Sequence, residues 1–206
     1  VQIVACGTSY HAGLVAKYWI EHLVGIPCQV EIASEYRYRR VVTLPKTLWI
    51  AISQSGETAD VLSALRHIDR TQVLATLAIC NVATSSLVRE TDLSLLTKAG
   101  PEVGVASTKA FTTQLTVLLL LSGLLAKTKN IAEFDESQFV GLLRSLPNSL
   151  TGVLAIETQI KNIKVGQKVE IKVDAYPKVE LTGKVLSKSP SNISTIEVRC
   201  LGSGLQ

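Results

Sequence analysis

The chain has 206 residues, of which 47% are hydrophobic and 18% charged, and its formal net charge is +4. This composition is typical of a globular protein with a sizeable core, and the lack of a dense Lys/Arg block argues against nucleic acid as a partner. The four cysteines are far apart in the sequence and form no CxxC pair, which predicts free thiols, a reducing cytoplasmic location and no metal site. We also expect no cofactor.

The first 150 residues alternate between apolar strands and helical patterns. The predicted strands are 2–6, 28–33, 47–53, 73–80 and 93–98. Helices are predicted after Thr8-Ser9 to about residue 23, at 34–38 with Ser34 as cap, after the Ser53–Thr58 loop to about residue 68, at 108–127, and at 136–145 with an end at Pro147. This alternation predicts an α/β fold in which a parallel sheet carries helices on both faces.

One apolar run, Leu115–Ala126, has the composition of a membrane segment. A span requires roughly 20 apolar residues, so this run predicts a buried helix instead. The chain starts inside a strand, without Met or a signal peptide, and we therefore expect it to be part of a longer protein.

The pattern changes after Leu150. Apolar and polar residues alternate with period two at 165–176, 179–185 and 193–198, with Gly and Pro between these segments. Such a pattern predicts short antiparallel strands. We therefore expect two domains, residues 1–150 and a β-rich tail at 151–206.

Three strand-to-helix turns in the first domain carry hydroxyl groups: Thr8-Ser9, Ser53–Thr58, and the turn that ends in Ser107-Thr108. The first N–H groups of a helix lack partners and carry partial positive charge, so such turns are suited to an anion. No Lys or Arg lies in Ser53–Thr58, which leaves neutral dipoles to hold it. The alternative is an ordinary turn with a Ser N-cap and Glu57 in the first helical turn.

The segments CGTS, ISQSGETADVL, AICNV, SSLVRETD and EVGVASTKAFTTQL carry a family resemblance. Together they closely resemble the first sugar isomerase (SIS) domain of the glutamine–fructose-6-phosphate aminotransferases, from Val1 to about Leu150. The resemblance implies a five-stranded, flavodoxin-like sheet. The amidotransferase domain and second SIS domain of that family are not within these 206 residues, so we expect binding without catalysis by this chain alone, and no catalytic residue is assigned.

The resemblance also implies the site. Ser53, Gln54, Ser55 and Thr58 match the loop that binds the phosphate of fructose-6-phosphate or glucosamine-6-phosphate. The residues that match the sugar-binding turns are Thr8, Ser9, Val105, Ala106 and Ser107. The expected partners are a sugar phosphate and a second SIS domain or a second copy of the chain.

The tail carries a different resemblance. Residues 157–206, with IKNIKVGQKVEIKVDAYPKVELTGKVLSKSP, resemble the β-barrel segment of HlyD-like periplasmic adaptor (membrane fusion) proteins. This resemblance implies an alternative function, as an adaptor piece that associates with a membrane transporter. A sugar-phosphate-sensing regulator domain is a further alternative.

Overall fold

The structure is a computed structural model that describes residues 1–102, 108–157, 162–171, 181–188 and 196–200. The chain divides into two compact units, Val1–Phe139 and Val140–Gln206. Helix α6, Glu136–Ala155, contains both this division and the expected boundary at residue 150.

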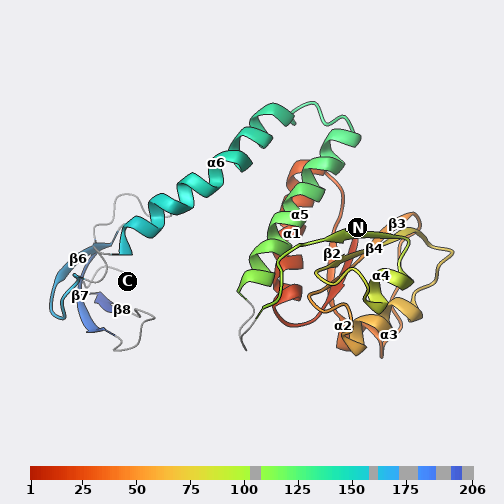
Figure 1. The fold of residues 1–206 in the computed structure, drawn as a ribbon, viewed down its shortest axis with the longest axis horizontal. Coiled ribbons are helices and arrows are strands. Elements are labelled where there is room, and N and C mark those ends of the chain that lie inside the picture. Colours follow the sequence, from red (N-terminus) through yellow and green to blue (C-terminus); the bar gives the residue numbers. More distant parts are fainter. Residues whose placement is uncertain (103–107, 158–161, 172–180, 189–195, 201–206) are drawn as a thin grey trace, which may run out of the picture. The chain divides into compact units, whose positions relative to one another are not determined.

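The first unit contains a five-stranded parallel sheet with the order β2-β1-β3-β4-β5 (Figure 1). Its strands are β1 Gln2–Ala5, β2 Gln29–Ile32, β3 Thr47–Ser53, β4 Val73–Cys80 and β5 Leu93–Leu96. This confirms the predicted α/β sheet. The chain runs from β1 to β2 on one side and then to β3 on the other, so the strand order reverses between β1 and β3. In open α/β sheets, ligands bind at the carboxyl ends of the strands beside such a reversal.

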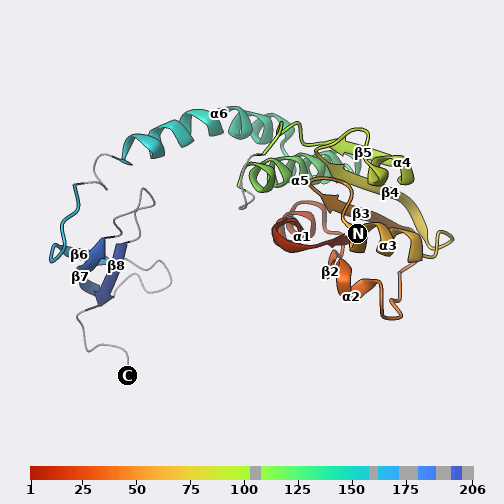
Figure 2. The same ribbon diagram turned by 60° about the horizontal axis from the view of Figure 1, so that its bottom comes forward.

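Helices cover both faces of this sheet (Figure 2). They are α1 Gly7–Val24, α2 Ala33–Tyr36, α3 Ala59–His67, α4 Ser86–Glu90 and α5 Lys109–Thr128. Alternate strand residues face opposite ways. Ile3 and Ile50 pack with α1 and α5, whereas Val4 and Trp49 pack with α2, α3 and α4. The indole of Trp49 donates a hydrogen bond to Tyr36 Oη over 3.3 Å.

The two smallest helices differ from the sequence-based expectation. Helix α2 begins at Ala33, so Ser34 lies inside it and is not its cap. Helix α4, five residues long, was not predicted, because a segment this short shows no helical periodicity. The end of α1 follows the prediction, since Gly25 adopts a left-handed conformation (φ 65°) and its N–H bonds Glu21 O.

Helix α5 is longer than the apolar run within it. At 20 residues it is long and apolar enough to cross a membrane, by length and composition alone. Leu118 and Ser122 are fully buried, and Gln114 is almost fully buried. Because Leu118 and Leu121 belong to the same cluster as the residues of α1 and the sheet, α5 is a core helix of the first unit, as predicted.

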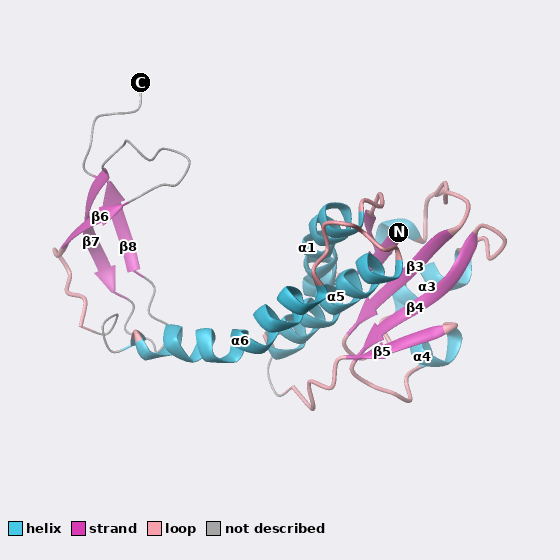
Figure 3. Ribbon diagram, turned by 90° about the horizontal axis from the view of Figure 1, so that it is seen from above, coloured by secondary structure: helices cyan, strands magenta, loops and turns pink. Residues whose placement is uncertain are grey.

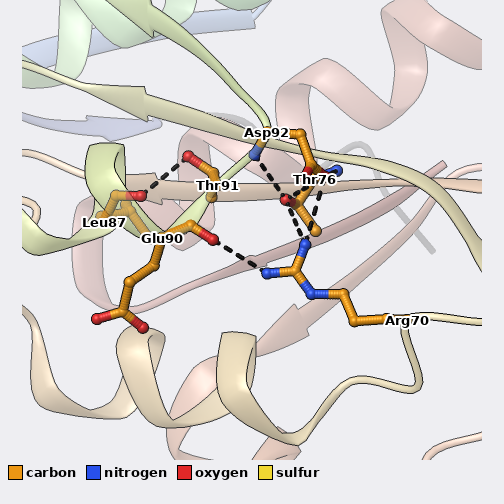
Figure 4. A network of polar contacts seen from close by, with 6 residues as sticks. All are labelled: Arg70, Thr76, Leu87, Glu90, Thr91 and Asp92. Carbon is orange, nitrogen blue, oxygen red and sulfur yellow. Dashed lines mark hydrogen bonds and ion pairs between the residues drawn. The ribbon is translucent and has the colours of Figure 1, made fainter.

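A polar network holds the start of β5 against β4 (Figure 4). The Asp92 carboxylate accepts hydrogen bonds from both Thr76 N and Thr76 Oγ1, each over 2.7 Å, and Thr76 Oγ1 accepts one from Asp92 N over 3.0 Å. Arg70 pairs with Asp92 over 3.3 Å and donates to the carbonyl of Glu90. These hydrogen bonds lower the pKa of Asp92. The network fixes the edge of the sheet far from the β1 and β3 turns.

Helix α6 does not end where the sequence predicted. It continues through Pro147 to Ala155, although Pro147 has no N–H to donate to the carbonyl four residues earlier. None of its residues is buried. The second unit also contains an antiparallel sheet, drawn in magenta in Figure 3, with strands β6 Lys168–Ile171, β7 Leu181–Lys188 and β8 Ile196–Cys200. The predicted antiparallel tail is thus confirmed for the described residues.

Candidate functional site

A cavity of about 370 Å³ opens at the carboxyl ends of β1 and β3, where the strand order reverses. Its lining consists of Cys6, Gly7, Thr8, Ser9, Ile52, Ser53, Gln54, Ser55, Thr58 and Glu102. The turn after β1 and the turn after β3 supply most of these residues. Parallel strands that are neighbours in the sheet bring their carboxyl ends together, which explains why turns almost 50 residues apart in sequence share one cavity.

Six of the nine predicted site residues line this cavity: Thr8, Ser9, Ser53, Gln54, Ser55 and Thr58. The other three, Val105, Ala106 and Ser107, lie outside the described residues. Thr8 and Ser9 belong to the first turn of α1, since that helix already begins at Gly7. The sequence reading had placed them just before the helix.

The Ser53–Thr58 loop is held by hydrogen bonds within the loop and by one from Asn81. Ser53 Oγ accepts a hydrogen bond from Gly56 N over 3.0 Å and shares another with Thr58 Oγ1 over 2.8 Å. Ser55 Oγ accepts a hydrogen bond from Glu57 N over 3.2 Å. The carbonyl of Gln54 accepts one from Asn81 N over 3.1 Å. These contacts fix the loop before any ligand arrives, which lowers the entropy cost of binding.

Gly56 lets the loop approach α4 closely. Its φ is +67°, and a Cβ atom at this position would lie 2.5 Å from Ser85 Cβ and 2.7 Å from Cys80 Sγ, and closer still to Ser85 Oγ. The Gly56 carbonyl also accepts a hydrogen bond from Leu87 N over 3.0 Å. The close approach, and not the turn conformation alone, therefore requires glycine here.

Glu57 does not lie in the first turn of helix α3, where the ordinary-turn alternative places it. It precedes Thr58, the N-cap of α3, and the acidic residue in the first turn of α3 is Asp60. The Glu57 carboxylate instead accepts a hydrogen bond from Ser86 N, at the start of α4, over 2.7 Å. This bond lowers the pKa of Glu57. The residue therefore connects the loop to α4.

Two helices present uncapped N-termini to the cavity. Neither the N-cap Cys6 of α1 nor the N-cap Thr58 of α3 makes a side-chain capping bond, and α1 has no acidic residue in its first turn. Unpaired N–H groups and the macrodipole make such ends suited to an anion. Because serine and threonine hydroxyls surround both ends, the cavity can hold an anionic group without a positively charged side chain.

Glu102 is a lining residue that the sequence reading missed. Its Oε1 accepts hydrogen bonds from Thr108 N over 2.9 Å and Lys109 N over 2.8 Å, and its Oε2 accepts one from Ala110 N over 3.3 Å. It therefore caps α5 from six residues before the N-cap, Thr108. The usual capping signatures lie within three residues of the helix start, so no local pattern reveals this role.

Charge is sparse around the cavity. Among its described lining residues, Glu102 alone carries a charged side chain. The nearby Lys109 donates through Nζ to the carbonyl of Pro101 over 2.7 Å. Within the described ranges, no group of three or more His, Cys, Asp or Glu side chains is arranged to hold a metal ion.

The chain is similar to known aminotransferases over most of its length. It is 63% identical over 164 residues to the glutamine–fructose-6-phosphate aminotransferase (isomerizing) of Pseudomonas syringae pv. tomato, and 57% identical over 162 residues to that of Haemophilus influenzae. These matches cover 79% and 78% of this chain, but 27% of each relative. The chain thus spans about a quarter of the length of these relatives.

A solved structure agrees with this relationship. The C-terminal domain of glucosamine-fructose-6-phosphate aminotransferase from Francisella tularensis matches with a TM-score of 0.70 and 50% identity, over 77% of this chain and 45% of that one. These relatives do not support the resemblance of the tail to periplasmic adaptors, and they favour neither the adaptor nor the regulator alternative. The SIS domain family model matches residues 1–122. The chain therefore belongs to the SIS domain family.

Proposed function

We propose that residues 1–150 form a sugar-phosphate-binding domain of the isomerase part of a hexosamine-forming aminotransferase, followed by a separate β-rich domain at 151–206. The main support is the cavity at the strand-order reversal, where two uncapped helix N-termini and six expected residues, five of them with hydroxyl groups, surround one space. The high identity to glutamine–fructose-6-phosphate aminotransferases suggests fructose-6-phosphate or glucosamine-6-phosphate as the ligand.

In this proposal the two turns have different tasks. Ser53, Gln54, Ser55 and Thr58 hold the phosphate through hydroxyl and backbone N–H groups at the start of α3. Thr8 and Ser9 contact the sugar from the start of α1, and Val105, Ala106 and Ser107 border it. Each hydrogen bond to a charged phosphate contributes about 1.5–3 kcal/mol, so a few of them are enough for micromolar to millimolar affinity.

The test is thermal unfolding of this chain with fructose-6-phosphate. At about tenfold the dissociation constant, a ligand that binds only the folded state stabilises it by about 1.4 kcal/mol, or roughly 3–5 °C for a domain of this size. Glucose at the same concentration should give no shift, because it lacks the phosphate.

A variant pair locates the binding site. Ser55→Ala removes a hydroxyl of the cavity and should weaken binding about tenfold or more. Ser63→Ala removes a hydroxyl from α3 at a residue that does not line the cavity, and should bind as the unmodified chain does. Equal affinity of both variants for fructose-6-phosphate would reject this site.

We further propose that the first domain packs against a second SIS domain or a second copy of the chain, in the cytoplasm. Leu120 and Leu124 on α5 are 49% and 57% exposed, which suits an interface. The described thiols Cys6, Cys28 and Cys80 are free, as expected in a reducing compartment. Sedimentation equilibrium tests the association. A monomer at all concentrations would reject the self-association, and Leu124→Glu should weaken it.

A further inference from the structure

Three helices begin at or beside the cavity, and their N-termini differ. Those of α1 and α3 lack a side-chain cap, whereas the first N–H groups of α5 are bonded to the Glu102 carboxylate. Since Glu102 itself lines the cavity, the α5 end is already occupied by an anion that belongs to the chain. Of these three helix N-termini, only those of α1 and α3 therefore offer N–H groups to an incoming phosphate.

This difference makes the electrostatic potential unequal on the two sides of the cavity. The partial positive charges of α1 and α3 attract a phosphate dianion, while the carboxylate repels it. The α5 macrodipole places roughly half an elementary positive charge at the helix N-terminus, and so offsets only part of the carboxylate's charge. A phosphorylated ligand is therefore oriented, with its phosphate near Ser53–Thr58 and its other end toward Glu102.

We propose that Glu102 is a specificity-determining residue, which orients the sugar phosphate and favours a ligand with a protonated amine over the same ligand with a hydroxyl. This inference rests on the proposed function, because it concerns the same cavity. A protonated amine is attracted to the carboxylate, and the interaction is charge-assisted. A hydroxyl in the same position gains much less. We expect a preference of about tenfold for the amine.

Two commercially available ligands differ in only this group. Isothermal titration of the chain with glucosamine-6-phosphate and with glucose-6-phosphate compares an amine with a hydroxyl at one carbon. We expect the amine to bind about tenfold more tightly. In Glu102→Gln the preference should fall below about twofold, because glucosamine-6-phosphate binds more weakly while glucose-6-phosphate does not.

Inorganic phosphate and a second variant serve as controls. Inorganic phosphate should bind Glu102→Gln at least as tightly as the unmodified chain, since repulsion is removed. Glu133→Gln removes one negative charge from an exposed residue that does not line the cavity, and it should keep the tenfold preference. Tryptophan fluorescence verifies that both variants are folded.

The outcomes are distinct. If neither sugar phosphate binds the unmodified chain, the proposed function itself fails. If both bind with equal affinity, the specificity role of Glu102 is overturned while sugar-phosphate binding stands, and this result needs no variant. A preference that persists unchanged in Glu102→Gln also overturns the role and assigns the discrimination to other residues.

Discussion

Replacement of Gly56 by alanine tests how the Ser53–Thr58 loop is held. An alanine at φ +67° costs about 1–2 kcal/mol, because its Cβ crowds the backbone in the left-handed region. The Cβ would also lie within 2.7 Å of Cys80 Sγ and closer to Ser85, two buried residues that must then shift. Overpacking of this kind adds about 1–3 kcal/mol. We expect a total loss of about 2–5 kcal/mol in the free energy of unfolding.

Urea unfolding followed by tryptophan fluorescence measures this loss. Both tryptophans, Trp19 and Trp49, lie in the first unit, so the signal reports on the domain that contains the loop. With a urea dependence of about 2 kcal/mol per molar, the midpoint should fall by about 1–2.5 M.

Gly100→Ala is the matched control. Its φ is +69°, almost the same as that of Gly56, but a Cβ there would meet no atom within 4 Å. It should therefore lose only the conformational part, about 1–2 kcal/mol. Equal losses in the two variants would show that the contact with Ser85 and Cys80 is not what requires glycine in the loop.

Two further predictions concern titratable groups. Asp92→Asn should destabilise the first unit by up to about 1 kcal/mol at neutral pH, a modest value because the carboxylate is half exposed. The folded-state pKa of Asp92 lies below its ordinary value, so the stability contributed by its carboxylate is present above about pH 4 and disappears as the pH falls further. A difference in urea midpoint between Asp92→Asn and the unmodified chain that persisted at about pH 2 would contradict the mechanism. Burial raises the pKa of the Cys28 thiol to about 11, so iodoacetamide at about pH 8 should label it at least about tenfold more slowly than the partly exposed Cys6 of the cavity. Peptide mass spectrometry measures both rates, and similar rates in the folded protein would refute the prediction, since only unfolding in urea should equalise them.

The larger strands were predictable from local patterns. Strands β3 and β4 have the predicted bounds, because each is a largely apolar run between polar segments and is buried on both faces over most of its length. The polar turns at Thr8 and Ser53 were found for the same reason, since they interrupt an apolar run directly before a helical pattern. That they line one cavity follows from the adjacency of β1 and β3.

Other features depend on contacts that no local pattern encodes. Glu102 reaches α5 across six residues, and Gly56 packs against Cys80 and Ser85, 24 and 29 residues later in the chain. The continuation of α6 past Pro147 shows the reverse case. The sequence rule predicted a stop there, but a proline inside a helix removes one backbone hydrogen bond and does not always end it.

The interior position of β1 in the sheet has a consequence for the order of folding. Its two edges pair with β2 and β3, so the first strand of the domain remains partly unpaired until the chain as far as residue 53 is available. Contacts of such long sequence separation form slowly, since the intervening loop must close first. The turn at Thr8 and Ser9 depends on this strand for its position. The cavity therefore forms only after β3 has docked, and a newly synthesised chain exposes an apolar edge until then.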